Sequence, residues 1–305
     1  MRRPAVDIQT LSAIYENARA LFLDIYNSTL PAYQTIAMEV ESNTQTEVHT
    51  WLGAIPTVKE WVSERSIERL SAFEYAVITR DWEMTIEIPR NAIEDDRIGQ
   101  FRPVIEMMAR QARNHPSMLV MQIFANNPVG YDNQPLFSTN HQEGQSGAQS
   151  NIVVGTGTTL AQIIDDLDQT SARFASFKDD RGNPIMIAGQ PLDITHVMVP
   201  PTLKGVFETI VRAEMIQNTT NKWQGRIEVI TNPYLTDPND WYALCLAHPF
   251  KPVLVQMRRP ATIQDFDSEV AAYELFHRKR FLIGVDGRYA VAPAFWQTAI
   301  RVSNA

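Results

Sequence analysis

Residues 87–125 read E-I-P-R-N-A-I-E-D-D-R-I-G-Q-F-R-P-V-I-E-M-M-A-R-Q-A-R-N-H-P-S-M-L-V-M-Q-I-F-A and decide the fold. They lead from the end of an alternating strand into a long helix. Apolar side chains recur at three-, four- and seven-residue steps, as in a buried helical stripe: Phe101, Ile105, Met108, Ala112, Leu119 and Ile123. At 1.5 Å per residue, a straight helix here would be roughly 37 Å long. We therefore expect it to support several other elements.

The residues at the ends of this run suggest where the helix begins and bends. Asp95 and Asp96 precede it, where carboxylates can cap free N–H groups and oppose the positive end of the helix dipole. Pro103 suits a first turn. Pro116 lies inside the run, so the sequence predicts a kink there or a split after His115.

The sequence before the helix predicts a pair of strands. Residues 82–88 alternate between apolar and polar side chains, and residues 73–77 do the same. A turn is expected at Thr79-Arg80-Asp81. After the helix, a polar loop runs from Tyr131 to His141. Residues 142–149 have almost no apolar content, which predicts a mobile connection.

The composition bounds the class of protein. The 305 residues are 44% hydrophobic and 20% charged, as in ordinary globular domains, and no apolar run approaches the length of a membrane span. We expect no secretory signal after the basic start. The only cysteine, Cys245, excludes an intrachain disulfide, and its apolar surroundings predict a buried thiol. A net charge of -8 argues against a dedicated DNA-binding protein.

Two further regions have readable patterns. Residues 158–258 resemble an α/β unit, with helices from about Thr158 and Thr202 and strands at 194–199, 227–230, 241–247 and 252–257. Strands are predicted near 271–276, 281–285 and 289–292, the last two joined by a hairpin at Asp286-Gly287.

No motif predicts a catalytic, cofactor-binding or metal site. Gly155-Thr156-Gly157 lacks the further glycine or lysine of nucleotide loops, so Thr158 is better interpreted as a helix N-cap. The six histidines form no metal-binding pair, although a spatial triad leaves no sequence signature. Arg258-Arg259 and Arg278-Lys279-Arg280 are short basic clusters, suited to strand ends, salt bridges between subunits or weak DNA contact.

Several short motifs of the sequence resemble those of the major head subunit of Mu-like tailed phages, the T protein family. They span most of the chain: Trp51-Leu52-Gly53, Ile55-Pro56, Lys59-Glu60-Trp61, Ile93-Glu94-Asp95-Asp96, Tyr131-Asp132, Pro135-Leu136-Phe137 and Phe295-Trp296-Gln297. The resemblance implies an α+β chain with the Hong Kong 97 phage capsid fold. It assigns residues 1–47 to an N-terminal arm and 48–90 to an extended β-hairpin loop. Residues 91–150 then form a peripheral domain with a long spine helix, 151–258 an axial α/β domain, and 259–305 the return strands of the peripheral domain.

The same resemblance implies a structural function and no enzyme. The expected protein self-assembles as hexamers and pentamers into an icosahedral shell around double-stranded DNA, which it does not bind sequence-specifically. Its expected partners are other copies, a separate scaffold protein, a maturation protease and a portal. It would be made in the bacterial cytoplasm and end in the virion. An encapsulin-like nanocompartment shell and a soluble hydrolase are the alternatives.

Two predictions about contacts between subunits follow. Residues 5–27 form an amphipathic helix, which either packs on its own domain or serves as the arm on a neighbour; Leu21 and Ile25 are its candidate contacts. Trp51, Trp61 and Trp82 crowd the extended loop, and tryptophan is enriched in buried interface centres. We expect at least one of them, and Arg65, to face a neighbour, the alternative for the tryptophans being the local core.

Overall fold

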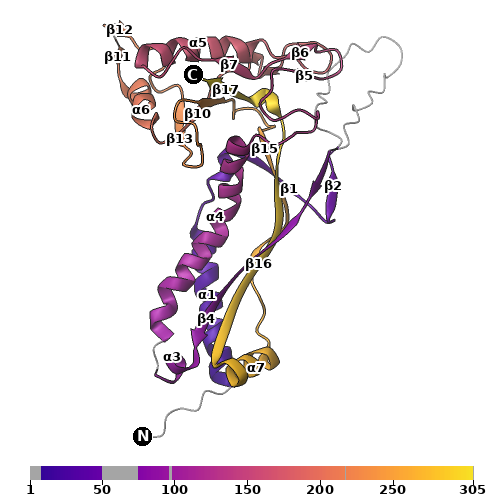
Figure 1. The fold of residues 1–305 in the computed structure, drawn as a ribbon, viewed down its shortest axis with the longest axis vertical. Coiled ribbons are helices and arrows are strands. Elements are labelled where there is room, and N and C mark those ends of the chain that lie inside the picture. Colours follow the sequence, from indigo (N-terminus) through magenta and orange to yellow (C-terminus); the bar gives the residue numbers. More distant parts are fainter. Residues whose placement is uncertain (1–7, 50–74, 96–97, 217, 305) are drawn as a thin grey trace.

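The computed structural model describes residues 8–49, 75–95, 98–216 and 218–304. The chain forms a long shaft with a broader layered unit at one end (Figure 1). The N-terminal helix begins at the far end of the shaft, whereas the C-terminus lies in the layered unit. No helix in this described part is both long and apolar enough to cross a bilayer.

The shaft is built on a four-stranded sheet, here called the shaft sheet, in the order β1-β15-β16-β4. The strands are β1 (Ala37–Glu41), β15 (Val253–Ile263), β16 (Arg280–Pro293) and β4 (Arg80–Pro89). β1 pairs with β15 in parallel, and the other two pairings are antiparallel. Burial alternates along β4, ending in fully buried Ile88, which confirms the predicted half-buried strand.

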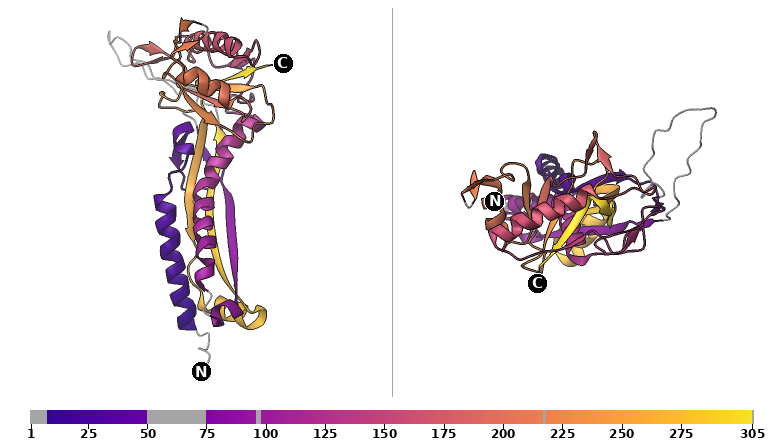
Figure 2. Two further views of the ribbon diagram at one scale, coloured as in Figure 1. Left: turned by 90° about the vertical axis from the view of Figure 1, so that its left-hand side faces the viewer. Right: turned by 90° about the horizontal axis from the view of Figure 1, so that it is seen from above.

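Helices run along the shaft (Figure 2). The long helix α4 (Arg102–Asn126) packs on β15, β16 and helix α1 (Ile8–Ser28). Shorter segments complete this part: α2 (Tyr33–Ile36), α3 (Arg90–Glu94), η1 (Ile98–Phe101) and α7 (Ser268–Arg278). Leu11, Phe22 and Met108 belong to one apolar core that joins α1, α4 and the sheet. Because α1 buries one face against α4, the amphipathic helix predicted from the sequence is confirmed.

The second unit contains a five-stranded sheet, here called the end sheet, in the order β13-β10-β14-β17-β7. Its strands are β13 (Glu228–Thr231), β10 (His196–Val199), β14 (Trp241–Leu244), β17 (Ala299–Ser303) and β7 (Ile152–Val154). The helices α5 (Leu160–Ala175) and α6 (Lys204–Arg212) pack beside it, and the turn η2 (Trp296–Thr298) leads from β16 into β17.

Four small hairpins project from these sheets. They are β2 (Thr46–Val48) with β3 (Ala76–Ile78), β5 (His141–Gln142) with β6 (Ala148–Gln149), β8 (Met186–Ile187) with β9 (Gln190–Pro191), and β11 (Met215–Ile216) with β12 (Thr219–Thr220). The hairpin β2–β3 is the root of the segment 50–74, which lies outside the described residues.

Several local predictions are wrong. Of the two outcomes expected at Pro116, the split is excluded, because α4 stays one helix of 25 residues. The kink stays a prediction. After Pro116, the buried residues of α4 are Val120 and Phe124, whereas the sequence predicted Leu119 and Ile123. N-cap Thr159, one residue after the predicted Thr158, forms a capping box with Gln162 at the start of α5. Residues 142–149 are not a mobile connection, because they form the β5–β6 hairpin around buried Glu143.

The strand pairing also differs from the prediction. No turn separates β3 from β4, because they pair with different partners, β2 and β16. Asp286-Gly287 is not a hairpin but the middle of β16, where neighbours flank it on both sides. A Cβ at Gly287 would lie 3.0 Å from the Ala261 Cα, so glycine permits close approach of β15 there. The segment predicted as a strand near 271–276 is helix α7.

The sheet membership departs from the expected domain limits at two places. β15, which starts at Val253, belongs to the shaft sheet rather than to the α/β unit. β17 lies in the end sheet, paired with β14 and β7, although residues 259–305 were expected in the peripheral domain. The turn η2 carries the chain across between them. The remaining limits stay predictions.

Candidate functional site

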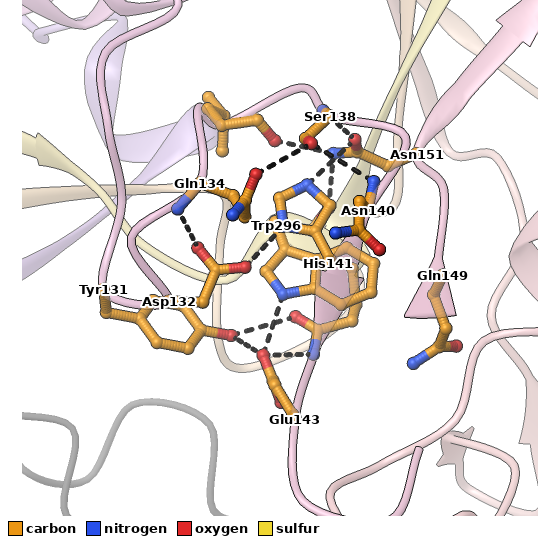
Figure 3. A network of polar contacts seen from close by, with 12 residues as sticks. Tyr131, Asp132, Gln134, Ser138, Asn140, His141, Glu143, Gln149, Asn151 and Trp296 are labelled. Carbon is orange, nitrogen blue, oxygen red and sulfur yellow. Dashed lines mark hydrogen bonds and ion pairs between the residues drawn. The ribbon is translucent and has the colours of Figure 1, made fainter. Parts of the chain in front are cut away.

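A buried polar network lies where the chain crosses between the two sheets (Figure 3). Its side chains come from the loop after α4, the β5–β6 hairpin, Asn151 ahead of β7, and the η2 turn. The sequence words Tyr131-Asp132 and Trp296-Gln297, far apart in the chain, meet in it. His141, Asn151 and Gln297 are each 0% exposed, so the centre of the network is buried.

His141 connects the two halves of the network. Its Nδ1 lies 2.5 Å from Oδ2 of Asp132, and its Nε2 lies 3.1 Å from Oδ1 of Asn151. The Asn151 orientation is fixed, because its amide nitrogen donates to the carbonyls of Leu136 and Ala299. Both ring nitrogens therefore face oxygen atoms, so the ring is held from both sides. The ring also stacks on Trp296, with centroids 4.2 Å apart.

Glu143 is the second centre of the network. Its Oε1 accepts hydrogen bonds from the Tyr131 hydroxyl, from Trp296 Nε1 at 2.8 Å and from Gln297 Nε2 at 3.0 Å. Burial raises the pKa of Glu143 to about 7, although these three donors act in the opposite direction. Burial likewise raises the pKa of Tyr131 well above its ordinary range, so this hydroxyl remains a donor.

The arrangement is suited to structure rather than to catalysis. A general base needs a free nitrogen within reach of a substrate, whereas both nitrogens of His141 are engaged and its side chain is buried. The hydroxyl of Ser138 donates to Gln134 Oε1, so it does not form a nucleophile–base pair with His141. Within the described ranges, no group of three or more His, Cys, Asp or Glu side chains could hold a metal ion. The network joins the end of α4 to the turn η2.

A second buried polar cluster fixes the root of the β2–β3 hairpin. Gln256 of β15 is 0% exposed; its Oε1 lies 2.9 Å from His49 Nε2, and its amide nitrogen donates to the Val77 carbonyl at 3.1 Å. The backbone of His49 donates to the Tyr75 carbonyl at 2.9 Å. One side chain of the shaft sheet therefore holds both strands from which residues 50–74 extend.

Comparison with known proteins identifies the family. The model of the family "Mu-like prophage major head subunit gpT" matches residues 11–166, 163–235 and 236–305. The chain belongs to the Mu-like gpT family.

Two curated relatives agree with the gpT assignment. The Mu-like prophage FluMu major head subunit of Haemophilus influenzae is 25% identical over 277 residues, which are 89% of this chain and 66% of that protein. The major capsid protein of Escherichia phage Mu is 29% identical over 175 residues, covering 55% of this chain and 57% of the relative. This chain thus spans less than two thirds of the length of either relative.

Solved structures share the fold of this gpT-family chain. The procapsid of bacteriophage JBD30 matches with a TM-score of 0.59 and 22% identity over 96% of this chain and 75% of the other. A virus-like particle from Pyrococcus furiosus matches with a TM-score of 0.54 and 10% identity over 95% and 99% of the two chains. The predicted α+β fold of the Hong Kong 97 capsid type is confirmed.

The predicted interface residues fall into two groups. Trp51, Trp61 and Arg65 lie outside the described residues. Leu21 and Ile25 are half-buried and pack against their own chain's core. Trp82 is half-buried too: its Nε1 donates to the Tyr289 carbonyl at 3.1 Å, and its ring lies beside that of His115. In the single chain, Leu21, Ile25 and Trp82 thus pack against residues of their own chain. Their role in contacts between subunits stays a prediction.

The predicted helix cap is wrong for Asp95. Asp95 occupies the C-cap position of α3, whereas the N-cap position of α4 is Phe101, without a side-chain cap. The chain inserts η1 between the two helices, which moves the start of α4 away from the acidic residues. Asp96 lies outside the described residues.

The basic clusters are largely paired with carboxylates. Arg278 and Arg280 both contact Glu274, and Arg280 also contacts Glu87 at 3.1 Å. Arg259 pairs with Asp286. These ion pairs within the chain reduce the charge available for phosphate groups.

Sequence reasoning missed Gln256 and Glu143. One feature of the sequence could have pointed to Gln256: it is a polar residue directly after the apolar run Val253-Leu254-Val255 of a predicted strand. No local feature of the sequence points to Glu143, since it lies in a polar stretch whose burial depends on residues more than 150 positions away.

Proposed function

We propose that this chain is the major capsid subunit of a Mu-like tailed phage or prophage. In this role it assembles as hexamers and pentamers into an icosahedral shell that encloses double-stranded DNA. The match of the gpT family over residues 11–305 is the observation that carries the proposal. The capsid fold shared with the JBD30 procapsid supports it.

The geometry suits a subunit that works by its shape. Many weak contacts close a shell by symmetry only if each subunit presents them at fixed angles. The polar network fixes the crossing between the two sheets, and Gln256 fixes the root of the β2–β3 hairpin. In the proposed shell, residues 48–90 are the extended loop that lies across a neighbour, and residues 1–47 form the arm.

We propose that the subunit's partners are further copies, a separate scaffold protein, a maturation protease and a portal. It catalyses no reaction and takes no cofactor. Its net charge of -8 and its paired basic clusters fit a wall that contains DNA without sequence-specific binding. The protein would be made in the bacterial cytoplasm and reside in the virion.

Negative-stain microscopy and sedimentation of the purified chain test this function. Closed shells or rings of five and six subunits are the expected result, since the contacts between copies are formed by residues of the subunit itself. A chain that stays monomeric at high concentration, also after addition of a scaffold protein from a related phage, would contradict the proposal.

A nanocompartment shell is the second candidate, because the virus-like particle from Pyrococcus furiosus shares the fold. The content of particles recovered from infected or induced cells separates the two functions. Nuclease-protected duplex DNA supports the phage shell, whereas a copurified cargo protein without DNA supports the compartment.

A further inference from the structure

Helix α7 lies at the far end of the shaft (Figure 1), and its outer face carries exposed apolar side chains. Val270 is 55% exposed, Tyr273 53% and Phe276 78%. The ring of His277 lies beside that of Tyr273, tilted by 38°, with centroids 4.4 Å apart. We call these four residues the α7 face. Large apolar side chains grouped on one exposed helix surface mark a contact site more often than a free surface.

The helix that carries this face is firmly fixed to its own chain. The Asp267 side chain caps its start by accepting from the backbone of Glu269 and Val270. Ala271 and Glu274 on the opposite side are buried, and Glu274 contacts both Arg278 and Arg280. The α7 face is therefore presented in a fixed orientation.

The charges on α7 are divided between its two ends. Asp267 and Glu269 lie at its N-terminal end, whereas Arg278 and Lys279 lie at its C-terminal end. Two copies placed antiparallel would bring each acidic end against a basic end. The opposed helix dipoles would favour the same arrangement.

We propose that the α7 face binds the α7 face of a second copy of this chain, antiparallel about a two-fold axis at Tyr273. In such an isologous contact residue i faces residue j, and j faces i. Centred on Tyr273, the contact pairs Val270 with Phe276 and Asp267 with Lys279. The apolar side chains then meet in the middle and the charges at the rim.

The contact is small, because an 11-residue helix is only about 16 Å long. Stable interfaces between proteins bury about 1,200–2,000 Å² in total, which one short helix face does not supply. The inference therefore rests on the proposed shell, in which other contacts hold the copies together and α7 links them at the ends of their shafts.

Disulfide crosslinking tests both the contact and its geometry. Tyr273→Cys, Val270→Cys, Phe276→Cys and the double variant Val270→Cys with Phe276→Cys are oxidised as purified particles and analysed on non-reducing gels. All changes lie on exposed positions, and native Cys245 is 1% exposed, so the wild-type chain is the blank. Circular dichroism checks the fold of each variant.

We expect disulfide dimers from Tyr273→Cys and from the double variant. The single variants Val270→Cys and Phe276→Cys are matched controls with few dimers, because each residue lies about 4.5 Å along the helix from the axis and faces the other. The absence of a dimer from Tyr273→Cys would overturn the proposed contact. The α7 face would then bind another partner or the first residues of its own chain. Equal self-crosslinking of Phe276→Cys would overturn the antiparallel geometry.

The failure of this proposal is distinguishable from that of the proposed function. Particles without a Tyr273→Cys crosslink leave the shell function intact and exclude the α7 contact. A chain that forms no particles contradicts the shell function and, with it, the α7 contact, because the α7 face is too small to hold two copies together outside a shell. The two failures therefore give different results.

Discussion

At the scale of single residues, Glu143 makes the stability of the subunit depend on pH. Burial raises the pKa of its carboxyl group in the folded chain from the ordinary 4.5 to about 7. Between these values the unfolded chain ionises while the folded chain keeps its proton, so stability falls as pH rises. The expected loss is about 3 kcal/mol between pH 4.5 and 7, with no further change above that range.

Urea unfolding of the unassembled subunit, compared with Glu143→Gln across pH 4 to 8, measures this effect. The glutamine keeps an acceptor for Tyr131 and Trp296 but does not titrate. The stability of the wild type minus that of the variant should decrease through the window. A difference that is constant with pH would show that Glu143 keeps its ordinary ionisation.

Asn151 is the residue on which the network depends most. Its side chain is 0% exposed and joins the backbone of Ser138, the ring of His141 and two carbonyl groups. Asn151→Ala leaves these groups without their partner, so we expect a loss of about 3 kcal/mol or more in unfolding free energy. Asn140→Ala, at an exposed asparagine just ahead of β5, is the control and should change stability by less than about 0.5 kcal/mol. Equal losses would mean that the buried hydrogen bonds of Asn151 do not carry the stability.

At the scale of elements, Gln256 links the β2–β3 hairpin to the shaft sheet. Gln256→Leu removes the donor to Val77 and the partner of His49, and we expect a cost of about 1–3 kcal/mol. The loss should be local. Hydrogen exchange should accelerate at the amides of His49 and Thr79, which bond Tyr75 and Gln45, while the β15–β16 ladder stays protected. Exposed Gln264→Leu is the control, and acceleration across the whole shaft sheet would contradict a local role.

At the scale of the whole molecule, the fold and the assembly should separate at residues 50–74. The segment leaves and rejoins the chain at His49 and Tyr75, whose backbones are hydrogen-bonded at 2.9 Å, so a two-residue turn can replace it. We expect the shortened chain to keep its circular dichroism and cooperative unfolding but to form no closed shells by microscopy. Shells from the shortened chain would exclude the loop as an assembly element, and loss of the helical signal would place it in the core.

The sequence by itself determined the elements whose side-chain period is unambiguous. The stripes of α1 and α4 and the alternation of β4 follow from burial of one face, which a local pattern records. The short motifs Tyr131-Asp132 and Phe295-Trp296-Gln297 likewise identified the family, although the neighbouring sequence does not explain why these residues are needed. The physical reason appears only when they meet around Glu143 and His141.

Tertiary structure alone decided which strands pair and which polar groups are buried. Asp286-Gly287 satisfies the local rule for a hairpin, yet β4 and β15 on either side keep the chain extended. Asp95 satisfies the rule for a cap, yet η1 separates it from α4. Glu143 and Gln256 are polar residues whose partners come from distant segments. Local patterns fix periodicity because neighbouring side chains determine it, whereas pairing and burial depend on contacts that exist only after the chain has folded.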